Sequence, residues 1–568
     1  MARICSQGVV GSKCASYAKV FVKEREKPPP APPKEGRASL RSLLWFLKRR
    51  EDGAHIREAA ENVGTHGSCV RSNNLIKPSS SHSYYIILSG RTSRASLHSK
   101  PFSFIYKPIC PQVWAPSLWE GRGWVFVFLC YFYFMVAKIA YLCKRMKRKI
   151  VIISLMALCL GSFAQQAKQD FKADRLLSAS NYLAYPGPLQ KTLTPAPKGY
   201  VPFYLSHYGR HGSRWLIGNR DYQRPVRWLE RADSLGKLTP KGQEVLAKLR
   251  RISEAARGRD GELTQLGAEQ HRGIAERMMR NFPEIFKGKT HVDAKSTTVI
   301  RCILSMENAL QQLARMNPAL EISHDASHHD MYYMNYADTA LFKTRMPKEV
   351  KATFEAFRNR HFHPERVMRL LFNDDDYWQK QVDFGKLYEL LFKQAANLQS
   401  TELRHSMSLY DLFNDDEIYD IWQVGNAWWY INFGPSPLNG GRQPTSQRYL
   451  LRKIISEADS CLRLNHPGAT LRYGHDTMVM PLTCLLGLDG TGVQVADLEQ
   501  LPAIGWSDYR IFPMACNLQF VFYRKAGSDD ILVKILRNEN EAKLPIKTDL
   551  YPYYHWKDVR AYCERVSQ

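Results

Sequence analysis

The chain has 568 residues, of which 44% are hydrophobic, and a formal net charge of +26. Such a length can bury a large core and accommodates two to four domains. The charge is concentrated before residue 165, where 26 Lys and Arg accompany 8 Asp and Glu, whereas the rest has 54 against 46. The greater part of the chain is therefore only mildly basic, which does not favour a nucleic-acid-binding protein and is compatible with an anionic substrate.

Residues 1–145 show no sustained helix or strand periodicity. They contain a proline-rich stretch at 28–33 and a serine triplet at 79–81, with Arg and Ser scattered along them. We interpret this segment as a non-native extension, translated from upstream of the true start, or as a disordered one. The apolar run 124–137 leaves open the alternative of a genuine basic extension tethered to a membrane.

Residues 146–164 have the organisation of a secretory signal peptide. A positive Met-Lys-Arg-Lys start precedes the apolar run 150–160, and Ser162 and Ala164 provide small residues at positions −3 and −1 of a cleavage site. The run is shorter than the roughly 20 apolar residues that a membrane span needs. The bulky Leu158 before Cys159 argues against lipoprotein processing. We therefore expect a periplasmic or secreted protein whose mature part has no stable membrane association.

The mature chain begins with a polar, helix-prone stretch and a proline-rich loop, and its first strand is expected at residues 200–205. Thr239 can cap a helix that has Pro240 at its first position, because the apolar residues that follow recur at helical spacing. Further along, the pattern predicts a helix at 263–282, a strand at 290–295 and a helix at 297–313.

Residues 345–432 are expected to be mainly helical, and strands return at 469–473, 518–523 and 531–536. A helical block between two groups of strands predicts an α/β domain with a helical insertion. We place the first part of this domain at 165–320, a helical cap at 321–440 and the second part at 441–568. Four aromatic residues at helical spacing are assigned to packing rather than to a ligand platform: Trp422, Trp428, Trp429 and Tyr430.

The first predicted strand leads into the segment 209–214, Gly-Arg-His-Gly-Ser-Arg. Phosphoryl transfer needs a nucleophile and cations for the phosphate oxygens, and His211 between Arg210 and Arg214 supplies both. A planar guanidinium can pair with two phosphate oxygens at once, and the glycines let the backbone approach the phosphate. A basic surface turn is the alternative explanation for so short a motif.

Three further segments strengthen the hypothesis of a phosphate site. Residues 261–267, Gly-Glu-Leu-Thr-Gln-Leu-Gly, open a helix, and Arg301 lies near the start of the next one, where a helix N-terminus favours anions. Residues 471–477, Leu-Arg-Tyr-Gly-His-Asp-Thr, join a strand to an apolar helix. At this junction His475 can bind phosphate and Asp476 can donate a proton.

In this order the four motifs resemble the histidine acid phosphatases, branch 2 of the histidine phosphatase superfamily, which includes phytases and is related to the multiple inositol polyphosphate phosphatases. The resemblance covers roughly residues 190–560. It implies a central sheet flanked by helices with an inserted helical cap domain, and hydrolysis of a small phosphomonoester without a metal or other cofactor. The roles it implies are nucleophile for His211, general acid for Asp476, and phosphate binding for Arg210, Arg214, Arg301 and His475.

The substrate stays open at this point. The inositol polyphosphate phosphatases typically have His-Ala-Glu where this chain has His475, Asp476 and Thr477. Phytate, other inositol or sugar phosphates and a broad substrate range therefore all remain candidates, and nothing indicates the oligomeric state. A phosphotransferase of the phosphoglycerate mutase type is an alternative, although the signal peptide argues against cytosolic metabolism. An inactive phosphate-binding member is another, which the full set of candidate residues disfavours.

Other polar groups in the sequence are weaker candidates for a site. The segment 324–330 contains three His and two Asp, but no hydrolytic metal signature surrounds them, so we expect a polar loop and no metal. Asp374 to Asp376 lack EF-hand spacing. His207 is expected to line the pocket or to pack beside the strand. Five cysteines after residue 164 are too widely spaced for a disulfide scaffold, although one disulfide is open: Cys302, Cys461, Cys484, Cys516 and Cys563.

Overall fold

The computed structural model describes residues 166–568. The signal peptide predicted at 146–164 and the extension predicted at 1–145 lie outside this part. No helix among the described residues combines the length and the apolar character needed to cross a membrane. None of the five cysteines of this part is paired in a disulfide, so the disulfide that the sequence left open does not form among them.

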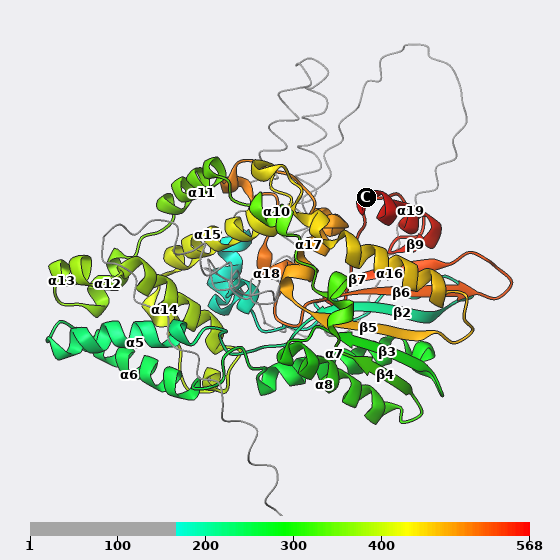
Figure 1. The fold of residues 1–568 in the computed structure, drawn as a ribbon, viewed down its shortest axis with the longest axis horizontal. Coiled ribbons are helices and arrows are strands. Elements are labelled where there is room, and N and C mark those ends of the chain that lie inside the picture. Colours follow the sequence, from blue (N-terminus) through cyan, green and yellow to red (C-terminus); the bar gives the residue numbers. More distant parts are fainter. Residues whose placement is uncertain (1–165) are drawn as a thin grey trace, which may run out of the picture. The chain divides into compact units, whose positions relative to one another are not determined.

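Eight strands form one mixed sheet in the order β4-β3-β5-β2-β6-β7-β8, with β9 paired to β7 (Figure 1). β2 and β5 are parallel, as are β5 and β3 and then β3 and β4, whereas β6 runs antiparallel to β2. The strands are β2 (Tyr200–Arg210), β3 (His291–Ser296), β4 (Glu321–Asp325), β5 (Gly468–Gly474), β6 (Asn517–Lys525), β7 (Leu532–Arg537), β8 (Asn540–Glu541) and β9 (Tyr553–His555).

Helices cover both faces of the sheet. Successive side chains of β2 point to opposite faces and belong to two different apolar clusters. Leu205 belongs to the cluster that includes α7 (Gln265–Asn281) and α8 (Ile300–Met316). Tyr204, its neighbour in the chain, belongs to the cluster formed with α16 (Arg448–Cys461), α17 (Asp476–Leu485) and α19 (Trp556–Val566). The sheet and its two helical layers confirm the predicted α/β class with a central, helix-flanked sheet.

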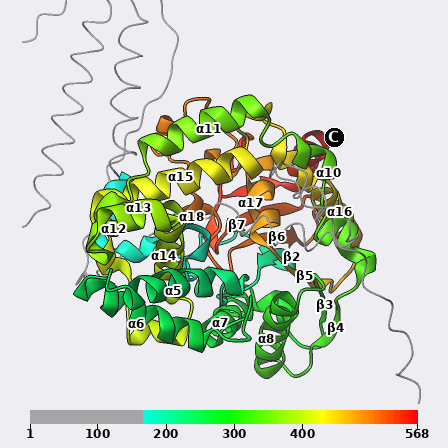
Figure 2. The ribbon, with the colours of Figure 1, turned by 60° about the vertical axis from the view of Figure 1, so that its left-hand side comes forward.

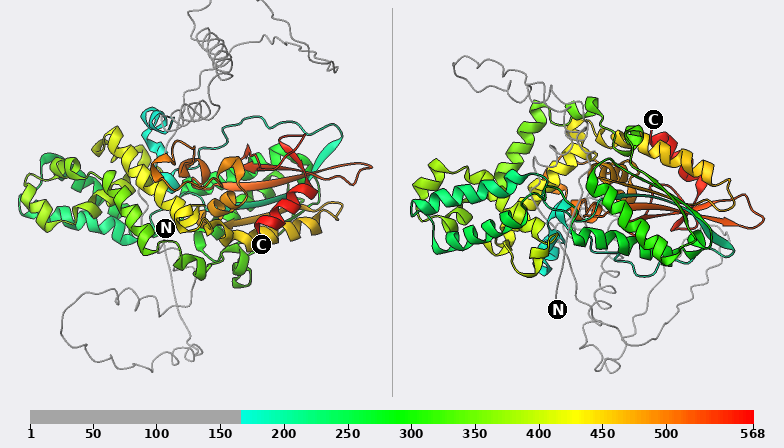
Figure 3. Two further views of the ribbon diagram at one scale, coloured as in Figure 1. Left: turned by 90° about the horizontal axis from the view of Figure 1, so that it is seen from above. Right: turned by 60° about the horizontal axis from the view of Figure 1, so that its bottom comes forward.

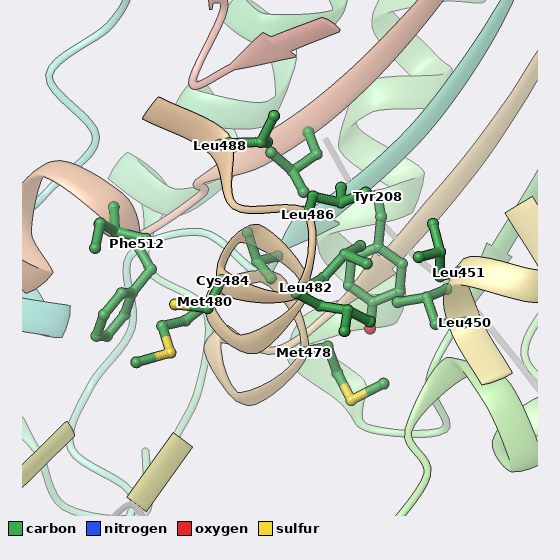
Figure 4. Packing of buried hydrophobic residues seen from close by; sticks show 14 of the residues in the cluster. Tyr208, Leu450, Leu451, Met478, Met480, Leu482, Cys484, Leu486, Leu488 and Phe512 are labelled. Atoms are coloured by element: carbon green, nitrogen blue, oxygen red, sulfur yellow. The ribbon is translucent and has the colours of Figure 1, made fainter. Parts of the chain in front are cut away.

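α17 is buried along its whole length, which its apolar sequence requires. Figure 4 shows Tyr208 and Leu451 on one side of this helix and Phe512 on the other. The helix therefore lies inside the molecule, packed between β2, α16 and the loop before β6. Its first residue is Asp476, so the core itself fixes the position of that carboxylate.

A second group of helices gathers beside the sheet (Figures 2 and 3). Its apolar cluster joins Leu229 and Leu249 to Leu371 and Leu391, so residues 219–255 pack with helices from the later block. The group consists of α5 (Asn219–Ser234), α6 (Pro240–Ala255), α12 (Glu365–Leu371), α13 (Asp375–Gln381) and α14 (Phe384–Leu398), with α11 (Lys348–Arg360) and α15 (Asp415–Phe433) beside them. The described residues also form three short α-helices: α9 (Met331–Met334), α10 (Thr339–Lys343) and α18 (Asp508–Ile511).

The aromatic residues of α15 serve packing, as the sequence predicted. Trp422 and Trp429 are fully buried, and Trp428 contacts Trp429 edge to face with ring centroids 5.3 Å apart. The indole Nε1 of Trp422 donates a hydrogen bond to the carboxylate of Asp508 at 2.9 Å. These rings join α15 to the core rather than forming an exposed platform.

Candidate active site

The predicted catalytic segments follow the carboxyl ends of neighbouring parallel strands. β2 ends at Arg210 and β5 ends at Gly474, and these two residues are paired in register. β3, on the other side of β5, ends almost level with them. His211 and His475 therefore leave the sheet side by side, at the edge where α/β proteins usually bind ligands.

His211 is fully buried, and its ring is oriented by its own loop. Nδ1 lies 2.9 Å from the carbonyl oxygen of Gly212. Because a carbonyl oxygen can only accept, this contact assigns the hydrogen to Nδ1 and leaves a lone pair on Nε2. Nε2 is buried and has no hydrogen-bond partner within residues 166–568. The ring is thus arranged to attack an electrophile through Nε2.

The surroundings of His211 keep its ring neutral. Burial, and next the positive guanidinium of Arg301, hold the pKa of His211 well below its ordinary value of 6.5. Three further neighbours act in the same direction: Arg210, Arg214 and His475. Because the neutral ring keeps its lone pair, such a histidine remains a nucleophile at an acidity that would protonate an exposed one.

Two glycines hold the loop after His211 tightly against α7. A Cβ on Gly267 would lie 2.2 Å from the carbonyl oxygen of Ser213, and one on Gly212 would lie 2.4 Å from the carbonyl oxygen of Gly267. The hydroxyl of Thr264 caps α7 by accepting from the Gly267 N–H, and donates to the carbonyl of Ser213 at 3.0 Å. The segment 261–267 therefore holds the loop after His211 in place.

Three buried arginines lie around His211. Arg210 is the last residue of β2, and its Nη2 is 2.6 Å from Oδ2 of Asp476. The guanidinium carbon of Arg214 is 5.4 Å from the ring centroid of Tyr182, so this ring supports the cation from one face. Arg301 occupies the first turn of α8, where the helix dipole adds to its positive charge.

His475 and Asp476 lie at the start of α17. The ring centroid of His475 is 5.7 Å from that of His211, and its Nε2 is 3.3 Å from the hydroxyl of Thr297. Asp476 is fully buried, and its Oδ1 accepts the backbone N–H of Thr477 at 2.8 Å. The pair therefore brings a second imidazole and a carboxyl group to the same edge of the sheet.

The second helical group reaches the site through α14 and the turn after it. Asn397 donates from its side chain to the carbonyl of Arg214 at 2.9 Å. The hydroxyl of Ser400 bonds to that of Ser213 at 3.2 Å. This group is therefore bonded directly to the loop that follows His211.

The structure brings together all six residues selected from the sequence: His211, Asp476, Arg210, Arg214, Arg301 and His475. It also adds a residue that sequence reasoning missed. Asn181, in the short 3-10 helix Ser180–Tyr182, donates from Nδ2 to Oδ2 of Asp476 at 3.1 Å. No motif marks this asparagine, and the residues between it and Asp476 number almost 300, so only the fold reveals the contact.

The other polar residues considered from the sequence pack against neighbours, cap a helix or form an ion pair. His207 contacts Tyr473 with ring centroids 5.2 Å apart, and burial lowers its pKa to about 3. Asp374 caps α13 through a bond from the Tyr377 N–H. His324 bonds to Glu307 at 2.7 Å. Across residues 166–568 no three His, Cys, Asp or Glu side chains form a group that could hold a metal ion.

One family model matches the chain, and solved structures share its fold. The family model of the histidine phosphatase superfamily (branch 2) matches residues 210–538. The multiple inositol polyphosphate phosphatase of Bifidobacterium longum, solved with inositol hexasulfate, superposes with a TM-score of 0.59 at 18% identity, covering 68% of this chain and 97% of that one. The phytase of D. castellii superposes with a TM-score of 0.50 at 13% identity, covering 68% and 84%. No curated protein sequence matches the chain.

Proposed function

Because this chain belongs to branch 2 of the histidine phosphatase superfamily, a group of phosphoric monoester hydrolases, we propose that it cleaves phosphomonoesters through a phosphohistidine at His211. The observation that carries the proposal is the state of the His211 ring. Its Nε2 is buried, has no partner among the described residues and is surrounded by cationic groups. A lone pair among guanidiniums is what attack on a phosphate dianion requires.

In the first step, Nε2 of His211 attacks phosphorus and forms the P–N bond, while the bond from phosphorus to the ester oxygen breaks. Asp476 gives its proton to the departing oxygen, so that an alcohol leaves and a carboxylate remains. Arg210, Arg214 and Arg301 hold the charge that spreads over the phosphoryl oxygens. His475, whose ring centroid is 5.7 Å from that of His211, donates to the same group.

In the second step, water attacks the phosphohistidine. The Asp476 carboxylate takes a proton from that water, the P–N bond breaks, and inorganic phosphate leaves with the imidazole restored. The bond from Nδ1 to the Gly212 carbonyl persists through both steps and prevents the ring from turning. Arginines carry the charge that a metal ion would otherwise neutralise, so the proposed cycle needs no cofactor.

Sugar and inositol phosphates, phytate included, are the proposed substrates. Support comes from the fold shared with an inositol polyphosphate phosphatase and a phytase, and from the concentration of positive charge around one buried nucleophile. We also propose export to the periplasm or beyond, on the signal-peptide pattern of residues 146–164. A phosphotransferase that uses the same phosphohistidine is the second candidate, and it would require an acceptor alcohol in place of water.

Trapping the intermediate tests this proposal. After rapid acid-free denaturation during turnover, the wild-type protein should carry one phosphate that is labile to acid and stable to alkali, on the peptide containing His211. His211→Ala should remove both the label and turnover while the circular dichroism spectrum stays that of the wild type. Turnover by His211→Ala within tenfold of the wild-type rate would exclude this nucleophile. Phosphate release without an added acceptor distinguishes hydrolysis from transfer.

A further inference from the structure

Asn181 bonds two members of the candidate site at once. Its side-chain Nδ2 donates to Oδ2 of Asp476 at 3.1 Å, and its backbone carbonyl accepts from Nη1 of Arg210 at 2.5 Å. Asn181 is fully buried, and so are both of its partners. A residue from the start of the mature chain thus joins the proposed acid to a proposed phosphate ligand.

The chemistry of the amide suits a group that changes its protonation state. Two described neighbours of Asp476, the guanidinium of Arg210 and the backbone N–H of Thr477, can only donate. The amide of Asn181 can donate from Nδ2 and can accept at Oδ1. Oδ1 is buried without a hydrogen-bond partner within residues 166–568. Rotation of the amide would therefore offer an unused acceptor to the O–H of a protonated Asp476.

The backbone around Asn181 is held in an unusual conformation by a buried carboxylate. Ser180 has a φ of +52°, in the left-handed region that a residue with a side chain rarely adopts without support from its surroundings. Its hydroxyl donates to Oδ2 of Asp508 at 2.5 Å. Asp508 is fully buried and also accepts from Nε1 of Trp422 at 2.9 Å and from the Tyr509 N–H at 2.7 Å. This network fixes the turn that presents Asn181 to the site.

We propose that Asn181 is a positioning residue for proton transfer at Asp476, and that Ser180 and Asp508 hold it in place. The proposal rests on the function given above. In the first step, Asp476 passes its proton to the leaving alcohol and Asn181 donates to the resulting carboxylate. In the second step, the carboxylate takes a proton from water and the rotated amide accepts from the new O–H. Asn181 itself neither gains nor loses a proton.

The test compares two leaving groups on the same variants. Asn181→Ala, and the nearly isosteric Asn181→Leu, should lower kcat for an alkyl phosphate by about tenfold or more. This is less than the roughly 10²–10⁴-fold that a general acid itself typically contributes, because the acid is still present. Hydrolysis of 4-nitrophenyl phosphate should fall less than about threefold, because its leaving group needs little protonation. KM should change little for either ester. Ser180→Ala should show the same selectivity to a smaller extent.

Asn432→Ala is the matched control. Asn432 is also a buried asparagine, but it donates to the carbonyl of Trp428 within α15 and is not among the described partners of Asp476. Rates are expressed per phosphorylated histidine formed in the burst with nitrophenyl phosphate, so that misfolded protein does not enter the comparison. Asn432→Ala should change both substrates in equal proportion.

The outcomes separate the two proposals. Equal losses for both esters in Asn181→Ala, or wild-type rates for both, would overturn the positioning role while the phosphohistidine stands. Absence of a phosphohistidine in the wild-type protein would overturn the proposed function, and with it the role of Asn181. A selective loss for the alkyl ester in Asn181→Ala, without one in Asn432→Ala, supports the proposal.

Discussion

Asp476 carries the proton in the proposed chemistry. Its two carboxylate oxygens have different partners, because it is the first residue of α17. Arg210 and Asn181 both reach Oδ2, whereas the helix backbone reaches Oδ1. The sequence singled out Asp476 and Arg210 because both lie in recognisable motifs. It did not find the asparagine, because a single buried amide has no sequence signature apart from the fold that places it.

Asp476→Asn tests the proposed proton donation by Asp476 independently of the proposed attack by His211. The amide cannot donate an acidic proton, so kcat for an alkyl or inositol phosphate should fall by roughly two or more orders of magnitude. The rate for 4-nitrophenyl phosphate should fall much less, since nitrophenolate leaves without a proton. Steady-state kinetics with both esters on one preparation measure the ratio. Equal losses would instead indicate that Asp476 only caps α17, at about 1 kcal/mol of stability.

Asp508 gives the stability of the fold a distinct dependence on pH. Burial raises the pKa of Asp508 to about 7 from an ordinary value of 3.8. The folded state therefore holds a proton that the unfolded state releases, so this contribution to stability is complete below pH 3.8 and is lost as the pH rises to about 7. The total is on the order of a few kcal/mol.

Chemical denaturation of Asp508→Asn between pH 4 and 7 tests this effect. The free energy of unfolding of the wild type, minus that of the variant, should decrease by about 1.4 kcal/mol per pH unit over this window. Taking the difference cancels the titration of all other groups. A difference that does not vary with pH would show that Asp508 ionises normally in the fold.

At the scale of elements, local pattern predicted most of the units that carry the site. The strand expected at 200–205 extends to Arg210 as β2, and the helix expected after Thr239 is α6, with the Thr239 hydroxyl accepting from Gly242 as its cap. α5 was not anticipated, because Pro225 interrupts its pattern although the helix continues through it. Its packing on α14 and α6 comes from long-range contacts that periodicity alone does not contain.

Gly267 and Gly273, on the same helix, provide a matched pair of substitutions. In Gly267→Ala the new Cβ would lie 2.2 Å from the carbonyl oxygen of Ser213. This is a backbone atom, and it cannot move without shifting the loop after His211. We expect a loss of roughly 1–3 kcal/mol and a strong fall in kcat. In Gly273→Ala the nearest atom, 3.0 Å away, is the end of the flexible Arg277 side chain.

Gly273→Ala should therefore keep activity and gain up to about 1 kcal/mol, because alanine is the better helix former. Thermal unfolding and kcat on both variants decide the matter. If Gly267→Ala were as active and stable as Gly273→Ala, α7 would not be clamping the loop.

For the whole molecule, the alternation of strands and helices and four ordered motifs were enough to predict the fold class. The same motifs led to the family that the comparisons identify. The composition of the second helical group could not be predicted, because residues 219–255 join it across more than 100 residues of chain. Equally, the depth at which charged and titratable groups are buried follows from tertiary packing and not from sequence pattern.

Two buried histidines should make the whole fold sensitive to acid. Burial lowers the pKa of His207 and of His271 to about 3 from an ordinary 6.5. Between these two pH values the histidines are protonated in the unfolded chain and neutral in the folded one. The contribution of the two histidines to stability is therefore complete above pH 6.5 and is lost as the pH falls towards 3. Each histidine contributes a slope of about 1.4 kcal/mol per pH unit in this window.

His271→Gln tests one of the two slopes. Between pH 6.5 and 3, the free energy of unfolding should fall less steeply in the variant than in the wild type, by about 1.4 kcal/mol per pH unit. The substitution will also change the stability at neutral pH, so the slope and not the absolute value is the measurement. Identical slopes would mean that His271 is protonated in the folded protein.

The absence of a disulfide among the five described cysteines bears on how the protein refolds. Four of them are buried, and Cys461 is partly covered. Since no cross-link among them contributes to stability, the described part of the chain should renature from urea in the presence of dithiothreitol as completely as in its absence. Cytoplasmic overproduction in a reducing host should likewise yield native protein. A refolding yield that rises only when an oxidant is added would contradict this expectation.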